Sequence, residues 1–132
     1  MKTHISLHTT DLEKSVAFYT TLLDVAPMKH YGDYALFIAE RPGLELALNS
    51  APRVSTSSDT HYGVAVESSD AVDATIARLR HAGLDVDVEV EETCCYAKQN
   101  KVWASDPDGR RWETYAVLEE VEGALGCCGG LP

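Results

Sequence analysis

The sequence predicts an α+β protein in which two βαβββ modules pair to form a curved mixed sheet around a shared cavity. Three observations lead to this prediction. A polar stretch, residues 50–60, divides the chain into two parts of similar length. The same order of strand and helix patterns occurs on both sides of this linker, and each side opens with a strand pattern that contains a histidine. A βαβββ unit exposes one face of its sheet, so two adjacent units can curve these faces around a cavity.

The first module, residues 2–49, begins with a strand, because polar and apolar residues alternate from His4 to His8. A helix follows, and Asp11 is suited to accept hydrogen bonds from its first free amide groups. Apolar residues recur along one face of this helix: Leu12, Val16, Tyr19, Leu22 and Leu23. Two or three short strands complete the module, at residues 28–31, 34–39 and 44–49.

The second module, residues 61–118, repeats this order, with a first strand at residues 61–66. Ser68 or Ser69 caps its helix, and Gly83 ends it. The remaining strands are predicted at residues 84–92, 96–104 and 111–117.

The first of these three strands alternates strictly between valines and acidic residues, which predicts that its acidic face is solvated. Asp106-Pro107-Asp108-Gly109 suits a type I turn between the last two strands. Residues 1–118 are therefore interpreted as one domain, and residues 119–132 as a flexible tail that contains cysteines.

The composition limits the possible partners. The 132 residues carry a formal net charge of −10 and the basic residues are scattered, so no nucleic acid and no anionic membrane surface is expected as a partner. No apolar run is long enough to span a bilayer. The first residues begin directly with polar and apolar alternation instead of the apolar block of a signal peptide, so we expect a cytoplasmic protein.

The first strand of each module carries a histidine, His4 and His61, and the last strand of the second module carries Glu113. If the modules pair by pseudo-twofold symmetry, the first strands are adjacent and these three side chains converge in the cavity. Two imidazoles and one carboxylate form the facial triad typical of non-haem Fe(II) oxygenases. The sequence therefore predicts a metal site. The competing interpretation is that each of the three is an ordinary surface or core residue.

Two further residues leave the ligand set open. His8 shares a strand face with His4, so it is either another ligand or a residue that supports one, and we favour the supporting function. Glu45 occupies in the first module the place that Glu113 occupies in the second. If Glu45 points into the cavity, the site has four protein ligands, which suits a six-coordinate hydrolytic or isomerase metal. If it points to solvent, the triad stands.

The four cysteines form two adjacent pairs, Cys94-Cys95 and Cys127-Cys128, instead of a spread disulfide framework. Adjacent residues of a regular strand point to opposite faces, so Cys94 and Cys95 can bind one ligand only from a loop or bulge. Two thiolates suit a trivalent monosubstituted arsenical, Cd²⁺ or Zn²⁺. Alternatively, both cysteines are small buried apolar residues. The glycine-flanked Cys127 and Cys128 either collect a soft ion for the first pair or lie in an end without function.

Three segments of the chain resemble the vicinal oxygen chelate superfamily, which includes glyoxalase I, extradiol dioxygenases and bleomycin- and fosfomycin-resistance proteins. They are His4 to Tyr19, His61-Tyr62-Gly63-Val64 and Asp106 to Glu113. The segment from Thr93 to Trp103, with its double cysteine, is similar to the ArsI/CadI group of organoarsenical carbon–arsenic lyases and cadmium-induced proteins. The resemblance extends over residues 2–118.

The resemblance implies an Fe(II)- and O₂-dependent enzyme that cleaves the carbon–arsenic bond of methylarsenite and trivalent aromatic arsenicals and releases arsenite. It implies that Cys94 and Cys95 bind the substrate, and that the metal ligands are His4, His61 and Glu113. Members of the superfamily pair their modules within one chain or between two, so either a monomer or a homodimer is expected. Two other functions stay open: a glyoxalase-type metal isomerase with Glu45 as a fourth ligand, and a protein that sequesters cadmium or arsenicals without catalysis.

Overall fold

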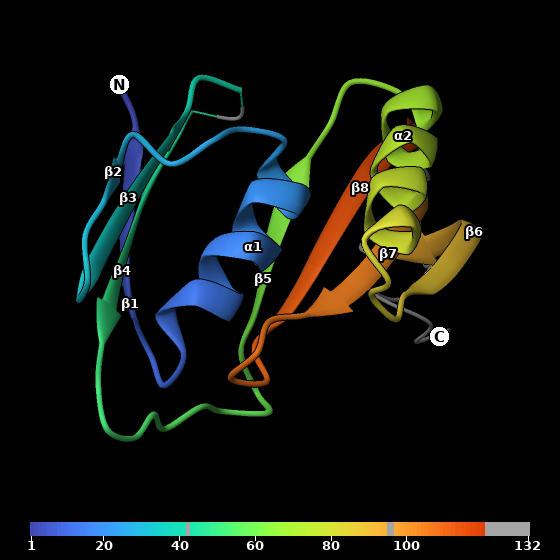
Figure 1. Cartoon of the computed structure of the whole chain (residues 1–132). Coiled ribbons are helices and arrows are strands. Elements are labelled where there is room, and N and C mark those ends of the chain that lie inside the picture. Colours follow the sequence, from blue (N-terminus) through green and yellow to red (C-terminus); the bar gives the residue numbers. More distant parts are fainter. Residues whose placement is uncertain (42, 95–96, 121–132) are drawn as a thin grey trace. The chain divides into compact units, whose positions relative to one another are not determined.

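The computed structural model describes residues 1–41, 43–94 and 97–120, with side chains described except at 91–94, 97–99 and 118–120. The chain forms two compact units: Met1–His61 with Ser105–Arg111, and Tyr62–Ala104 with the residues from Trp112 onward. Each sheet has four strands and is accompanied by one helix (Figure 1). The strand order β1-β4-β3-β2 of the first sheet is matched by β5-β8-β7-β6 in the second, so the predicted duplication of a βαβββ module is confirmed.

The first unit begins with strand β1 (Thr3–Thr9), which is followed by helix α1 (Leu12–Leu23). Asp11 is the N-cap of α1, as predicted, because its side chain accepts a hydrogen bond from the backbone amide of Lys14. The other strands are β2 (Lys29–His30), β3 (Tyr34–Ala39) and β4 (Leu44–Ser50). Strand β1 pairs with β4 in parallel, whereas β3 pairs with β2 and β4 in antiparallel fashion, which makes the sheet mixed.

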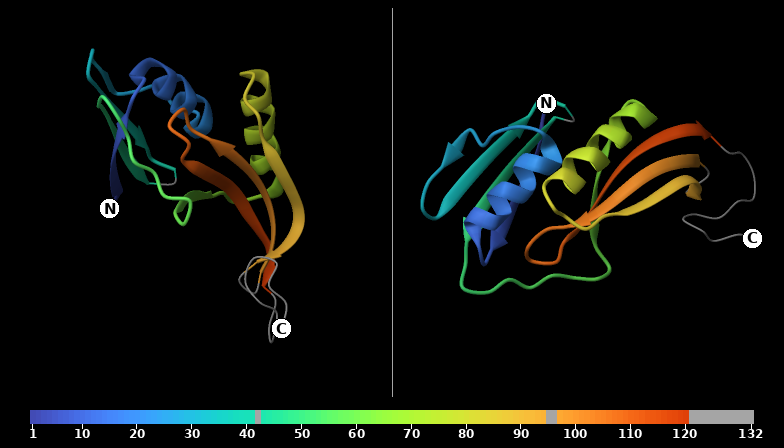
Figure 2. Two further views of the ribbon diagram at one scale, coloured as in Figure 1. Left: turned by 90° about the horizontal axis from the view of Figure 1, so that it is seen from below. Right: turned by 45° about the vertical axis from the view of Figure 1, so that its right-hand side comes forward.

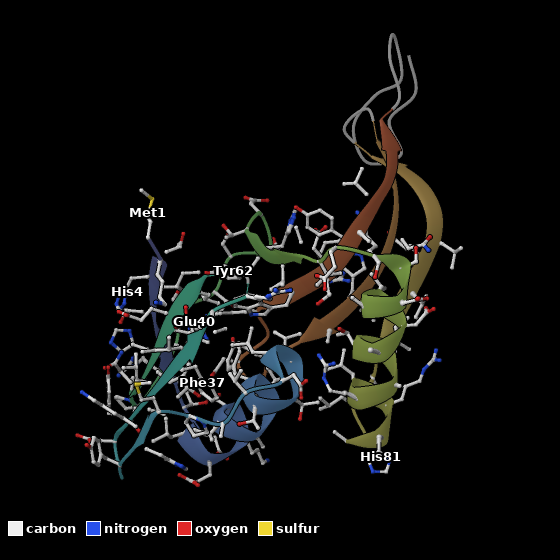
Figure 3. The ribbon with its side chains drawn as sticks, turned by 90° about the horizontal axis from the view of Figure 1, so that it is seen from above. Met1, His4, Phe37, Glu40, Tyr62 and His81 are labelled. Atoms are coloured by element: carbon white, nitrogen blue, oxygen red, sulfur yellow. The ribbon has the colours of Figure 1, made fainter. Side chains whose placement is uncertain are left out.

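Helix α1 covers one face of the first sheet (Figure 2). Tyr19 of the helix and Phe37 of β3 are both fully buried, and their ring centroids lie 6.4 Å apart. Figure 3 shows Phe37 toward α1 and His4 on the other side of the sheet. Residues of a strand alternate between faces, so Glu45, the register partner of His4, also lies on the face away from the helix.

The second unit contains helix α2 (Ser69–His81), whose N-cap is Ser68. The strands of the second sheet are β5 (His61–Ala65), β6 (Asp87–Cys94), β7 (Ala97–Ser105) and β8 (Arg111–Glu120), and only their end residues His61, Ser105 and Arg111 belong to the first unit. Gly83 follows the helix with φ +79°, a left-handed conformation that glycine adopts without steric cost, as predicted for the helix end. No helix in the described part of the chain is both long enough and apolar enough to cross a membrane.

Strand β6 differs from its prediction in two respects. It begins at Asp87, three residues later than the alternating pattern indicated, and both Val88 and Val90 are exposed to solvent. The physical reason is its place at the edge of the sheet, together with a register shift against β7 between Glu89 and Glu92. Because of this shift, the strict alternation does not produce one buried valine face.

Candidate metal and substrate site

The second sheet has two distinct faces near the start of β5. Tyr62 and Trp112 lie on one face, where their rings stack with centroids 4.9 Å apart. Gly63 and Glu113, the next residues of the same strands, therefore face the opposite side. A Cβ atom at Gly63 would lie only 3.2 Å from Cγ of Glu113, so the Glu113 side chain extends over the backbone of Gly63. Glycine is needed here because a larger residue would displace the carboxylate.

Lys101 of β7 reaches Glu113 from the other neighbouring strand. The preceding residue, Asn100, donates a hydrogen bond to the Ser69 hydroxyl of α2 at 3.0 Å, so Lys101 points to the face away from that helix. Its Nζ lies 3.5 Å from Oε1 of Glu113 and 5.8 Å from the ring centroid of Trp103. Lys101 is 2% exposed and Glu113 8% exposed, so both charges are buried.

Lys101 is not among the residues that the sequence analysis selected. In the sequence it is the last of four polar residues, Lys98 to Lys101, and directly precedes the apolar residues Val102, Trp103 and Ala104. A charged residue in a strand is common at a solvated face, and the sequence alone contains nothing that assigns this lysine to a buried position beside Glu113.

His61, the predicted metal ligand of the second module, is the first residue of β5 and is exposed. It stands two residues before Gly63, so its Cα–Cβ bond projects on the same face as Gly63 and Glu113. Both predicted ligands of the second module therefore come from strands of the second sheet, although His61 belongs to the first compact unit and Glu113 to the second.

The first unit carries the third predicted ligand, His4, directly opposite Glu45 in the register of β1 and β4. Nδ1 of His4 lies 2.8 Å from Oε1 of Glu45, and the two side chains are 53% and 37% exposed. Glu45 therefore contacts a predicted ligand instead of extending into solvent alone. His8, on the same face of β1, is exposed, and its backbone carbonyl accepts a hydrogen bond from Nη2 of Arg110 at 2.6 Å.

The described residues contain no group of three or more His, Cys, Asp or Glu side chains placed to hold a metal ion. The predicted triad takes His4 from the first unit and Glu113 from the second, so it stays a prediction. The donor set itself fits a divalent metal, since imidazole nitrogen and carboxylate oxygen are its usual ligands. The buried carboxylate of Glu113 already has a cation, Lys101, beside it.

The predicted thiol site falls largely outside the described residues. Cys95, Cys127 and Cys128 are not described, and for Cys94 only the backbone is. Cys94 is the last residue of β6 and pairs with Ala97, the first residue of β7. Substrate binding by these cysteines therefore stays a prediction.

Residues 3–114 match the Glyoxalase/Bleomycin resistance protein/Dioxygenase superfamily. The chain belongs to this superfamily. Over 120 residues it is 42% identical to a trivalent organoarsenical cleaving enzyme of Bacillus sp. (strain MD1), covering 90% of this chain and 74% of that protein. It is 41% identical over 121 residues to the cadmium-induced protein CadI of Mycobacterium tuberculosis (strain ATCC 25618 / H37Rv), covering 92% of this chain and 79% of CadI.

Solved structures of the superfamily share the fold. A glyoxalase/bleomycin resistance protein/dioxygenase from Nocardioides matches with a TM-score of 0.63 and 27% identity, covering 100% of this chain and 87% of the other. The fosfomycin resistance protein FosX from Listeria monocytogenes matches with a TM-score of 0.68 at 19% identity, covering 86% of this chain and 90% of FosX. The predicted α+β architecture of the superfamily is thereby confirmed.

Proposed function

We propose that this chain cleaves the carbon–arsenic bond of trivalent organoarsenicals, such as methylarsenite and trivalent aromatic arsenicals, and releases arsenite. The observation that carries the proposal is the 42% identity with an enzyme named for this cleavage. The double cysteine Cys94-Cys95 lies within the matched residues 3–114, and two adjacent thiols have the valence that a monosubstituted trivalent arsenical requires.

In this proposal the metal ligands are His4, His61 and Glu113, and the metal is Fe(II). Bound there, Fe(II) supplies a position at which O₂ becomes reactive toward the carbon–arsenic bond. Glu113 contributes a carboxylate whose place is fixed by Gly63 and Lys101. Since Nδ1 of His4 lies against Glu45, Nε2 is the nitrogen left for the metal.

Cys94 and Cys95 perform the substrate-binding step. Each thiol gives up its proton and attacks trivalent arsenic as a thiolate, and each displaced hydroxyl group takes up one proton, so two arsenic–sulfur bonds form, two arsenic–oxygen bonds break and two water molecules leave. Free thiols persist in a reducing compartment, which is consistent with a cytoplasmic location. The step fixes arsenic at one point and leaves its organic substituent free to approach the metal.

The decisive test incubates Fe(II)-loaded protein with methylarsenite in air and under anaerobic conditions, and measures arsenite by chromatography. We expect catalytic arsenite release only with O₂. Cys94→Ser and Cys95→Ser should each abolish turnover while the protein stays folded, whereas the matched tail variants Cys127→Ser and Cys128→Ser should retain it. Turnover by either Cys94→Ser or Cys95→Ser contradicts thiol capture.

A sequestration function is the first alternative, and the 41% identity to a cadmium-induced protein favours it. It predicts stoichiometric binding of Cd²⁺ or the arsenical through the cysteines with no arsenite formed. A glyoxalase-type isomerase is the second alternative, favoured by the contact between His4 and Glu45, which suits a fourth ligand. It predicts activity without O₂ and without the cysteines.

A further inference from the structure

Strand β8 divides its side chains between the two faces of the second sheet. On the face opposite to Glu113, three successive side chains are at most 2% exposed: Trp112, Thr114 and Ala116. Tyr115 and Val117 lie on the same face as Glu113. Tyr115 is half-buried and Val117 is 47% exposed. The face that carries the predicted ligand Glu113 therefore also presents two largely apolar side chains to solvent, one after the other along the strand.

The ring of Tyr115 lies beside the Glu113 side chain, and both extend over Gly63 of β5. Cε1 of Tyr115 is 3.3 Å, and Cγ of Glu113 is 3.2 Å, from the position that a Cβ atom of Gly63 would occupy. The missing side chain of Gly63 thus lets the aromatic ring and the carboxylate approach the same point of the sheet. A group bound at the Glu113 carboxylate therefore has an aromatic ring as its neighbour.

Tyr115 also lies on the side of Glu113 that leads toward the cysteine pair. Strands β7 and β8 are neighbours in the sheet and are joined by the short turn at residues 106–110, so they run antiparallel (Figure 1). From this turn β8 passes Glu113 first and Tyr115 second, toward the end of β7 at which Ala97 pairs with Cys94. The organic substituent of an arsenic atom held by the cysteine pair therefore meets Tyr115 before it reaches Glu113.

We propose that Tyr115 is a specificity-determining residue whose ring binds the organic substituent of a trivalent arsenical and favours aromatic substituents over methyl. Two aromatic rings in contact are stabilised beyond the burial of their apolar area, whereas a methyl group covers only a small part of the ring. Val117 extends the same apolar surface along β8. The inference rests on the proposed function, because the substituent reaches Tyr115 only if the cysteine pair holds arsenic.

The test measures the binding of phenylarsenite and methylarsenite by calorimetry under anaerobic conditions. Tyr115→Ala removes the ring, and the control Tyr31→Ala removes a ring that is 61% exposed in the first unit. We expect Tyr115→Ala to lower the ratio of phenylarsenite affinity to methylarsenite affinity roughly tenfold, and Tyr31→Ala to leave this ratio unchanged. Tyr115→Phe keeps the ring and should keep the ratio within about twofold of wild type. A wild-type ratio in a folded Tyr115→Ala variant overturns the proposal.

Co(II) binding, also measured by calorimetry, separates contact with the substrate from support of the metal site. Loss of a group that only holds a metal ligand in place lowers metal affinity about 10- to 100-fold. We expect Tyr115→Ala to bind Co(II) within about threefold of wild type, because the ring binds the substituent and not the metal. A Co(II) loss of the larger size, or an equal loss of affinity for both arsenicals, would assign Tyr115 a supporting function and overturn the proposal.

A pair of valine variants keeps the proposal testable if Tyr115→Ala fails to fold. Val117 lies on the face of Tyr115, whereas Val88 lies on the opposite face, because its register partner Val102 directly follows Lys101. Val88 is 39% exposed, so Val117→Ser and Val88→Ser make the same change at two exposed positions. We expect Val117→Ser to lower the affinity ratio about threefold and Val88→Ser to leave it unchanged. Equal ratios in both serine variants and wild type contradict an apolar substituent site on this face.

Arsenite release by the wild-type protein separates this inference from the proposed function. If Fe(II)-loaded wild type releases no arsenite in air while Tyr115→Ala still lowers the affinity ratio, the proposed cleavage is wrong and the substituent site stands. If wild type releases arsenite while Tyr115→Ala keeps the wild-type ratio, the cleavage stands and only the assignment of Tyr115 is wrong.

Discussion

Each unit of the chain contains a buried ion pair, and the two pairs differ in the distance between their charged groups. In the first unit Asp106 pairs with Arg110 at 3.0 Å, and it also accepts the Tyr19 hydroxyl at 2.5 Å. Two backbone amides donate to its other oxygen, and Arg110 donates to the carbonyl of His8. In the second unit Lys101 and Glu113 share one contact of 3.5 Å.

The difference between the two ion pairs indicates that they serve different functions. A buried pair that satisfies its donors and acceptors fixes the fold and has no capacity left for a ligand. A buried pair whose charged groups are farther apart contributes less to the fold through that contact. We therefore interpret Asp106–Arg110 as a structural pair and Lys101–Glu113 as a pair that serves a site. The variants below test this distinction.

The largest expected effect is on stability, from Asp106→Ala. This change leaves the buried Arg110 without its counter-charge, so we expect the free energy of unfolding to fall by about 3–5 kcal/mol. Urea unfolding of the metal-free protein measures it. Asp59→Ala removes an exposed acid from the same unit and should cost less than about 0.5 kcal/mol. Equal losses in the two variants would show that the pair adds nothing to the fold.

Glu113→Gln should weaken metal binding more than it lowers stability, whereas Asp106→Ala acts on stability. The amide oxygen can still accept from Lys101, but the buried ammonium loses its counter-charge, so we expect a loss of about 2 kcal/mol in the free energy of unfolding. Co(II) affinity should fall about 100-fold, because the amide is a poor ligand, which corresponds to about 2.7 kcal/mol. Calorimetry and urea unfolding on the same samples provide the two numbers. A stability loss as large as that of Asp106→Ala would remove the distinction between the pairs.

The elements of the fold could be predicted from the sequence because their signals are local. Asp11 caps α1 through the amide of Lys14, three residues away, and Ser68 caps α2 through the amide of Ala71. The structural ion pair has no such signal. Tyr19 and Asp106 are separated by 87 residues, and only the folded chain brings them together. The turn Asp106–Gly109 was predicted, whereas its buried hydrogen bonds were not.

The same limit applies to the candidate site, whose metal and thiol ligands stay predictions. The repeated order of elements makes Glu45 equivalent to Glu113, and this equivalence can be read from the sequence. The register of β1 and β4, which sets His4 against Glu45, depends on strand pairing over 41 residues. Lys101 could not be identified as a site residue from the sequence, because its burial depends on how the strands of the second sheet pair.

Glu45→Gln extends the comparison to a third charged pair, which is half exposed. We interpret Glu45 as a partner that orients His4, so its loss should weaken Co(II) binding about tenfold, or about 1.4 kcal/mol. This is a smaller loss than the one expected for Glu113→Gln. Calorimetry decides between the interpretations: equal losses in the two glutamine variants would identify Glu45 as a fourth ligand and favour the isomerase function.

The smallest expected effect concerns Asp108, in the same turn as Asp106. Burial raises the pKa of Asp108, but hydrogen bonds from Thr9 and Thr10 and the charge of Arg110 outweigh burial, so the pKa lies below its ordinary value of 3.8. The Thr10 amide and hydroxyl donate to its Oδ1 at 3.1 and 2.7 Å. Ionised Asp108 therefore stabilises the folded chain.

Because the pKa is lowered on folding, this stabilisation is complete above pH 3.8 and is lost as the pH falls through the lower folded value. Asp108→Asn has no such titration, so we expect it to be less stable than wild type by about 1 kcal/mol at pH 7. Urea unfolding between pH 7 and the acid limit of folding should show the difference shrinking only in the acid range. A difference that stays constant with pH would mean that the hydrogen bonds to Asp108 stabilise the turn independently of its charge.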